Sequence, residues 1–185
     1  MNYALYKTNG DVFAIYEIDC EERSISYKKK RLAVIEHLKK SLDLSNVDLS
    51  YSDLKDIDLS YAYLEGANLS HTYLSYVNLS YSNLSHVNLK YAELDESRLC
   101  YANLEDADLT KVDLTGANIM NANLTNANLK GADLTRVDLS NTNVTNVILK
   151  ETVINKIENI EFENVNLKSI YGKIMIESLE NDTRE

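Results

Sequence analysis

The sequence predicts an all-β solenoid, a right-handed quadrilateral parallel β-helix of about six coils with an N-terminal cap. Three observations predict the solenoid. A leucine-class residue recurs at every fifth position from Leu44 to Ile154, a small or β-branched residue stands two positions before it, and Asp or Asn usually stands between them. The repeating unit is therefore A-(D/N)-L-x-x, and its leucine-class residue is called the centre below.

A period of five residues fits neither an ordinary helix nor a flat strand. On an α-helix five residues advance about 500°, so the centres would spiral around the axis. On a flat strand they would alternate between the two faces. If the chain turns after every unit, each centre points inward from a new side, and four units close one coil. The coils then stack as parallel strands, whose crossovers are right-handed.

Residues 1–41 do not follow the repeat, and we expect them to form a β-hairpin followed by a helix. Apolar runs at Tyr3–Tyr6 and Val12–Ile18 flank an Asn-Gly pair, which supplies the positive φ angles of a tight hairpin turn. A third short strand over Ser24–Tyr27 is an alternative for the linker. Apolar residues at three-residue spacing predict a helix over Lys28–Ser41.

We expect this N-terminal segment to cover the open end of the first coil, where an uncapped edge would expose unpaired backbone groups. The helix begins with the basic run Lys28–Arg31. That run is interpreted as a solvated helix start or an internal partner of the acidic coils. Contact with nucleic acid or lipid headgroups is the alternative.

The chain therefore divides into a cap at residues 1–41, a β-helix at 42–154 and a C-terminal part at 155–185. The repeat loses its register after Ile154. We expect a last partial coil around Ile160–Leu167, then a terminal strand or short helix over Ile170–Leu179. The final residues are expected to be frayed.

The charge of the chain excludes some partners. The formal net charge is -10, and residues 42–154 hold sixteen acidic against seven basic side chains. Such a surface repels nucleic acid and anionic membranes and favours basic proteins. No apolar run is long enough to span a membrane and no signal-peptide pattern opens the chain, so we expect a cytoplasmic protein. Cys20 and Cys100 are expected to be reduced thiols.

No arrangement of residues predicts catalysis, a metal site or a cofactor. The three histidines, His37, His71 and His86, lack metal-ligand spacing with cysteines or carboxylates. There is no phosphate-binding loop, and the outward serines have no general base beside them. We therefore expect a non-enzymatic binding protein.

Carboxylates gather on one side of the predicted coil, where residues twenty apart share a column. One column holds four of them and is interrupted only by Tyr73; three more lie beside it. This acidic face comprises Asp53, Asp56, Glu93, Asp95, Glu96, Asp113 and Asp133. It is either ordinary solubilising charge or a binding surface, because like charges at ladder spacing repel unless a cation or basic partner is present.

Tyrosines form a second outward feature. Tyr61, Tyr81 and Tyr101 share one column, and Tyr51 and Tyr91 flank His71 in another. Stacking that stiffens the coils, or packing against the N-terminal hairpin, is one interpretation. A surface for a partner or for a second copy of the chain is the other, since tyrosine is enriched in interfaces.

The repeat at Leu44–Ile154 resembles the pentapeptide-repeat proteins, whose fold is a right-handed quadrilateral β-helix and whose functions are diverse. Resemblance to the quinolone-resistance members of that family implies an acidic, DNA-mimicking rod that binds a type II topoisomerase, DNA gyrase or topoisomerase IV. A nuclease or a phage-defence complex is an equivalent target. The alternative function is a structural scaffold or homodimer that uses the tyrosine face.

Overall fold

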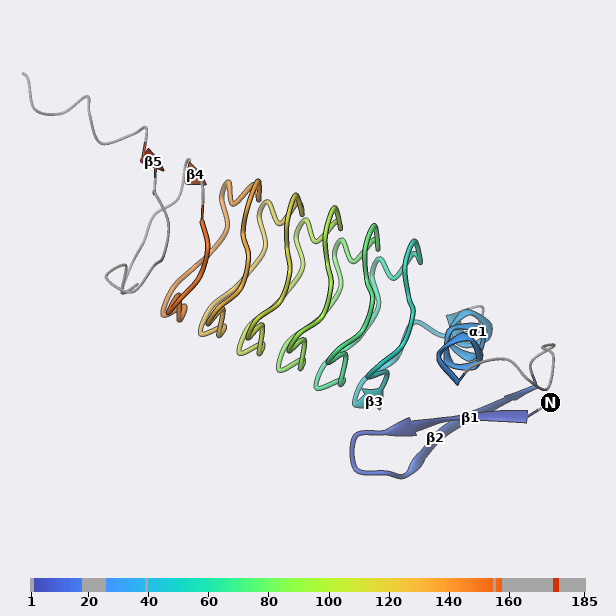
Figure 1. Cartoon of the computed structure of the whole chain (residues 1–185). Helices are drawn as coiled ribbons and strands as arrows, with labels where there is room; N and C mark the ends of the chain where they lie inside the picture. Colours follow the sequence, from blue (N-terminus) through green and yellow to red (C-terminus); the bar gives the residue numbers. More distant parts are fainter. Residues whose placement is uncertain (1, 18–25, 39, 155, 158–174, 177–185) are drawn as a thin grey trace, which may run out of the picture.

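The computed structural model describes residues 2–17, 26–38, 40–154, 156–157 and 175–176. Figure 1 shows a rod of stacked coils, with the helix labelled α1 and a β-hairpin at its N-terminal end. Parallel β-bridges join residues twenty apart, from Asp43↔Tyr63 to Asp133↔Val153. The predicted coil of four five-residue units is therefore confirmed.

The leucine-class centres fill the interior of the coils. Every centre from Leu44 to Ile154 is at most 6% exposed, and from Val47 to Thr152 the residue two positions before each centre is buried as well. A fully buried leucine side chain contributes about 2 kcal/mol relative to an exposed one. The two inward positions of each unit thus build one continuous apolar core along the rod.

Hydrogen bonds explain why each unit needs Asp or Asn before its centre. In each unit, two amides donate to backbone carbonyls of the next coil: the amide of the centre and that of the second residue after it. The amide of the residue just before the centre donates to a backbone carbonyl of the preceding coil. The amide two before the centre donates to the previous centre's carbonyl and closes a β-turn. Only the amide just after the centre lacks a backbone partner, and the Asp or Asn side chain accepts from it, as Asp58 Oδ1 does from Ser60 N at 3.0 Å.

The second residue after each centre, called the turn residue below, lies in the left-handed region. From Asn46 to Glu151 every turn residue has a positive φ, between 54° and 62° for the non-glycine residues. None of them is β-branched. β-Branched side chains tolerate this conformation least, so their absence from these positions is a direct sequence signature of the turn.

The N-terminal hairpin consists of β1 (Asn2–Lys7) and β2 (Val12–Glu17). The expectation of positive φ at both Asn9 and Gly10 is wrong, because only Gly10 has one, at 91°. Gly10 N donates to Lys7 O at 2.9 Å, and Lys7 N donates to Asp11 O at 2.8 Å. The loop is therefore a three-residue turn that ends on a left-handed glycine.

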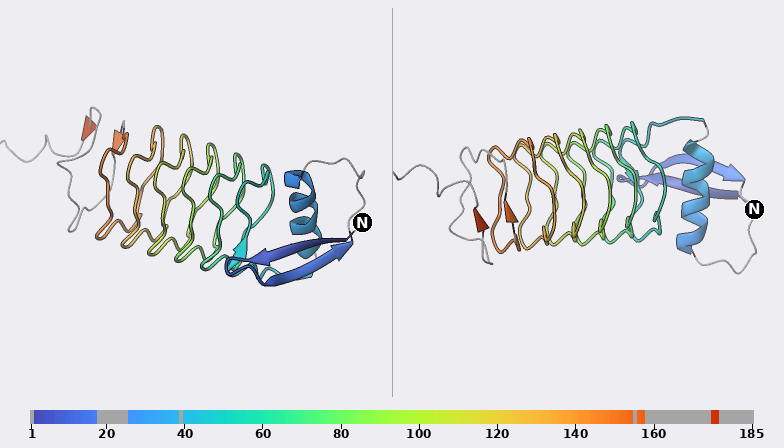
Figure 2. Two further views of the ribbon diagram at one scale, coloured as in Figure 1. Left: turned by 60° about the horizontal axis from the view of Figure 1, so that its bottom comes forward. Right: turned by 90° about the horizontal axis from the view of Figure 1, so that it is seen from above.

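The helix α1 spans Ser26–Leu38, so it begins and ends earlier than predicted. Ser26 and Tyr27 belong to the helix and not to a third strand; the remainder of that predicted strand lies outside the described residues. Just beyond the helix, the amides of Lys40 and Ser41 both donate to the carbonyl of His37 and thereby satisfy one of its last carbonyls. Figure 2 shows α1 lying across the end of the first coil.

Hairpin and helix satisfy the exposed edge of the first coil. β1 pairs antiparallel with β3 (Val47–Asp48), which gives the strand order β2-β1-β3. At this edge no preceding coil supplies backbone amide donors, so two backbone carbonyls per unit lack their usual hydrogen-bond donor. Side chains of α1 donate to several of these carbonyls. The bonds are Lys30 Nζ to Ser50 O at 2.7 Å, Arg31 Nη1 to Lys55 O at 2.6 Å and His37 Nε2 to Asp43 O at 2.7 Å.

Two residues of the basic run are thus internal partners of the coils, although they bind backbone carbonyls and not acidic side chains. Burial lowers the pKa of the Lys30 ammonium, and the nearby carboxylate of Asp48 partly offsets this effect. The edge of the first coil presents several unpaired backbone carbonyls, and charged side chains form stronger hydrogen bonds to them than neutral ones. This explains why the basic residues Lys30 and Arg31 lie at this end of an otherwise acidic rod.

At the other end, β4 (Lys156–Ile157) pairs parallel with β5 (Met175–Ile176). This pairing has an offset of nineteen residues and not twenty. β5 lies within the predicted strand or helix at Ile170–Leu179. The predicted partial coil at Ile160–Leu167 and the frayed end lie outside the described residues.

Candidate protein-binding surfaces

The acidic column lies in register along one side of the rod. Consecutive parallel bridges join Asp53 to Tyr73, Tyr73 to Glu93, Glu93 to Asp113, and Asp113 to Asp133. Glu93 is exposed and the three aspartates are partly exposed. The structure therefore brings the four column carboxylates together on one side of the rod, as predicted from their spacing.

The other three sides of the rod differ from this one, because two of them have asparagines between their acidic residues and the third holds a single acidic residue, Asp43. Asn68 Nδ2 donates to Asp48 Oδ1 at 3.1 Å, and Asn88 Nδ2 donates to Asn68 Oδ1 at 3.0 Å. Asn78 likewise donates to Asp58 at 3.0 Å. In the acidic column no amide separates Glu93, Asp113 and Asp133, so three carboxylates follow one another at strand spacing, about 4.8 Å.

Three of the column carboxylates also serve their own turns. Asp53, Asp113 and Asp133 each accept the amide two residues on, at 3.3, 2.9 and 2.8 Å. An asparagine side chain would accept the turn amide equally well. The turn therefore explains why a side-chain oxygen is needed at these positions, but not why that side chain is negatively charged. Glu93 is the exception: its carboxylate has no hydrogen bond or ion pair within the described part of the chain.

The three acidic residues beside the column lie at the next corner of the coil. Asp95 accepts a hydrogen bond from Ser75 Oγ at 2.6 Å, and Glu96 forms an ion pair with Arg136 at 3.2 Å. Asp56 is an exposed turn residue. Asp95 and Glu96 are therefore engaged within the chain, and the column is the more available part of the acidic face.

The residues Tyr61, Tyr81 and Tyr101, called the tyrosine ladder below, stack along one corner. Their ring centroids are 5.1 and 4.9 Å apart, and the rings are within 5° of parallel. Each of these tyrosine residues is 50 to 59% exposed. The predicted stacking is confirmed, and the hairpin pairs with β3 on another part of the first coil.

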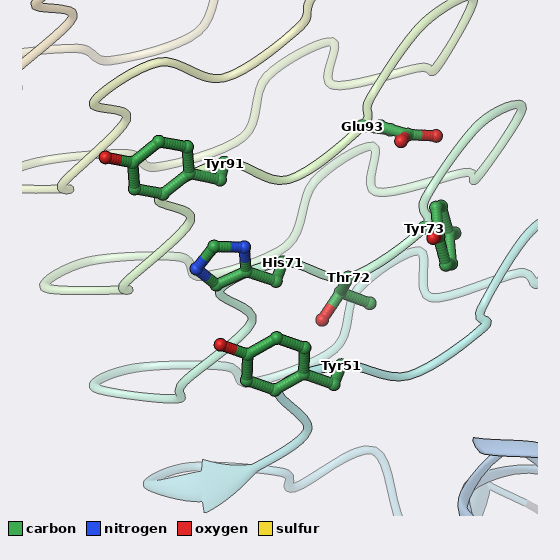
Figure 3. Close-up of a pocket in the computed structure, with 6 residues that line it drawn as sticks. All are labelled: Tyr51, His71, Thr72, Tyr73, Tyr91 and Glu93. Carbon is green, nitrogen blue, oxygen red and sulfur yellow. The ribbon is translucent and has the colours of Figure 1, made fainter.

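The residues Tyr51, His71 and Tyr91, called the mixed ladder below, stack at 4.7 and 4.8 Å. The order of the four turns in each coil places this ladder on the corner diagonally opposite the tyrosine ladder. The mixed ladder borders the acidic column, and a pocket of about 190 Å³ lies between them (Figure 3).

That pocket was not predicted from the sequence, although a signal for it exists. Tyr73 and Glu93 line it and stand at successive levels of one column, where the repeat normally has Asp or Asn. A larger pocket of about 400 Å³ lies between α1 and the first coil, lined by Arg31, Ile35, Leu38, Asp56, Ile57 and Asp58.

Within the described residues, no group of three or more His, Cys, Asp or Glu side chains could hold a metal ion. Among the same residues, no helix is both long and apolar enough to cross a membrane. Cys100 is a partly exposed free thiol, and Cys20 lies outside the described residues.

Comparison with solved structures finds several similar solenoids. HetL of Nostoc sp. strain PCC 7120, a pentapeptide repeat protein involved in heterocyst differentiation regulation, is 31% identical with a TM-score of 0.58. That match covers 60% of this chain and only 52% of HetL, about half its length. Rfr23 of Cyanothece 51142, another pentapeptide repeat protein, is 28% identical with a TM-score of 0.62, over 64% of this chain and 95% of Rfr23.

QnrB1, a plasmid-mediated fluoroquinolone resistance protein, is 17% identical with a TM-score of 0.51, over 71% of this chain and 77% of QnrB1. This likeness concerns the fold alone. A search of curated protein sequences gave no significant match.

The family model for pentapeptide repeats, which describes eight copies of the unit, matches at residues 43–80, 52–90, 78–116, 88–126 and 113–151. These matches span more than half of the chain and coincide with the stacked coils. Proteins of this kind form right-handed quadrilateral β-helices, in agreement with the ladder of bridges described above. The chain belongs to the pentapeptide-repeat family.

Proposed function

We propose that this protein is a non-enzymatic protein-binding rod whose acidic column occupies the DNA-binding surface of a basic partner, such as a type II topoisomerase. One observation carries the proposal. Glu93, Asp113 and Asp133 follow one another without an intervening amide, whereas no other side of the coils has two acidic residues at successive levels. Stacked like charges repel, so a cationic partner would relieve their repulsion.

The charge density of the rod supports the same proposal. The coils at residues 42–154 carry nine more acidic than basic side chains, and at strand spacing they extend about 27 Å. This gives one net negative charge per about 3 Å of axis, against about 1.7 Å for duplex DNA. A basic groove that binds DNA would therefore meet a rod with roughly half the charge density of its usual ligand.

The test neutralises the column without disturbing its turns. The variant carries Asp53→Asn, Glu93→Gln, Asp113→Asn and Asp133→Asn, in which each asparagine can still accept its turn amide. The control carries the same charge change elsewhere on the coils: Glu65→Gln, Glu105→Gln, Asp106→Asn and Glu151→Gln. Each exposed ion pair contributes up to about 1 kcal/mol, so the column variant should bind up to a few hundredfold more weakly.

The assay is DNA supercoiling by a type II topoisomerase with increasing amounts of each protein. Inhibition by the wild type and the control variant, but not by the column variant, would support the proposal. Equal inhibition by all three would rule out the column as the binding surface. Absence of inhibition by any of them would exclude a topoisomerase target and direct the same comparison to a nuclease or a defence complex.

The tyrosine ladder favours a second candidate function, a scaffold that dimerises through aromatic contacts. Its three rings are about half exposed although they are stacked. Replacing all three by asparagine, the residue that continues this column at Asn121 and Asn141, should preserve the left-handed turns. In sedimentation velocity, a wild-type dimer that becomes a monomer in this variant would support the candidate. A wild-type protein that sediments as a monomer would contradict this second candidate function.

A further inference from the structure

A pocket of about 190 Å³ separates the mixed ladder from the acidic column. Figure 3 shows Tyr51, His71 and Tyr91 along one wall, Tyr73 and Glu93 along the other, and Thr72 between them. We infer that this pocket receives one arginine side chain of the basic partner. The inference rests on the proposed function, because it names the group by which that partner is recognised.

The carboxylate of Glu93 provides the charge that an arginine requires. Unlike Asp53, Asp113 and Asp133, Glu93 makes no bond to its own turn, and no ion pair engages it within the described residues. Both of its oxygens are therefore available. A carboxylate with two available oxygens can accept two parallel N–H groups from a guanidinium.

The aromatic walls provide the second element of recognition. Lys55 Nζ already lies 5.1 Å from the ring centroid of Tyr73, and Lys111 Nζ lies 5.3 Å from that of Tyr91. These rings thus attract cations within the protein itself. Figure 3 shows Tyr73 edge-on, with one face of its ring turned toward the mixed ladder. A planar guanidinium can stack on such a face and pair with a carboxylate at the same time, which an ammonium cannot do.

The pocket also lies where the sequence departs from its own repeat. Tyr73 and Glu93 replace the Asp or Asn that would accept the turn amide, so the amides of Ser75 and Asp95 lose that bond. A hydrogen bond of this kind contributes about 1 kcal/mol. Two successive departures in one column, both facing one pocket, are explained by a binding role and not by the stability of the coil.

The test uses the isotope-labelled full chain and N-acetyl-L-arginine methylamide, followed by NMR. We expect resonances of Thr72, Tyr73, Tyr91 and Glu93 to shift, with a dissociation constant on the order of 1–10 mM. The citrulline derivative, which has the same shape without the charge, should shift none of them. The lysine derivative should bind more weakly than the arginine derivative.

Two matched variants isolate the pocket. Glu93→Gln should weaken arginine binding about threefold to fivefold, whereas Glu105→Gln, which lies outside both the acidic column and the pocket, should leave it within about twofold. Superimposable amide spectra away from the pocket would establish that both variants are folded. Equal shifts with citrulline, equal weakening by the two variants, or arginine shifts spread over all acidic residues would each overturn the inference.

The supercoiling assay separates this inference from the proposed function. Arginine binding that is lost in Glu93→Gln supports the pocket even where no topoisomerase is inhibited, and only the proposed target then fails. Topoisomerase inhibition that Glu93→Gln leaves unchanged, together with no arginine binding, overturns the inference while the acidic column keeps its role.

Discussion

The carboxylate of Glu96 passes over Gly116 to reach the guanidinium of Arg136, forty residues along the chain, with 3.2 Å between Oε1 and Nη2. All three are turn residues of one column, so the ion pair spans two coil steps. A Cβ added to Gly116 would lie 2.7 Å from Glu96 Oε1. The glycine therefore opens the path along which two other turn residues meet.

Gly116→Ala should destabilise the protein by about 1–2 kcal/mol in urea unfolding, mainly because alanine disfavours the positive φ of 70°. The displaced Glu96–Arg136 pair is exposed and contributes little. Gly116→Asn is the matched variant, since asparagine tolerates the left-handed conformation while adding the same Cβ. We expect a smaller loss from asparagine. An equal loss from both would show that the contact with Glu96, and not φ, sets the effect.

Arg31→Ala should loosen the first coil, because Arg31 Nη1 donates to Lys55 O at 2.6 Å and lies 3.5 Å from Asp53 O. A hydrogen bond from a charged group contributes about 1.5–3 kcal/mol. Hydrogen exchange should therefore accelerate at amides of the first coil and much less at coils far from the cap. Arg136→Ala removes an exposed arginine and should change stability by less than about 1 kcal/mol. Similar losses from both variants would contradict a capping role for Arg31.

Tyr81→Asn should cost about 1–2 kcal/mol in unfolding free energy, because the Tyr81 ring stacks on both Tyr61 and Tyr101. Tyr76→Asn is the control: Tyr76 is also a turn residue, with φ of 60° and 61% exposure, and no ring stacks on it among the described residues. Its replacement should be close to neutral. If Tyr76→Asn were as costly as Tyr81→Asn, ladder stacking would not be the source of the stability.

Acid should remove a part of the stability that Asp58 supplies. Hydrogen bonds from the hydroxyl and amide of Ser60 lower the pKa of the Asp58 carboxyl; burial opposes this effect, and a hydrogen bond from Asn78 adds a smaller contribution that lowers the pKa. A pKa lower in the folded than in the unfolded state gives stability that is present above the unfolded pKa and is lost as pH falls through the folded one. The loss therefore lies below about pH 4.

Asp58→Asn keeps the acceptor for the Ser60 amide but cannot titrate. Thermal melts at decreasing pH should show the wild type losing stability more steeply than this variant below about pH 4, with no divergence near neutral pH. If the stability of the wild type and of Asp58→Asn changed in parallel over the whole pH range, the hydrogen bonds to Asp58 would not stabilise its charged form over its neutral form.

The sequence by itself determined the solenoid. A contact in a repeat coil joins a residue to one twenty positions away, and the buried centres, the turn-capping Asp or Asn and the unbranched turn residues recur in every unit. Because these requirements are local and periodic, the period fixed the columns, including the in-register acidic column and the tyrosine ladder.

Only the tertiary structure decided the features that no period encodes. It placed Lys30 and Arg31 on backbone carbonyls of the first coil, paired β1 with Val47–Asp48 and set Glu96 against Arg136. It also brought Tyr73 and Glu93 to a pocket beside the mixed ladder. These contacts depend on how the non-repeating cap packs against the first coil and on the conformations of exposed side chains. Both depend on hydrogen-bond partners that lie outside the repeating unit, so the repeat pattern cannot encode them.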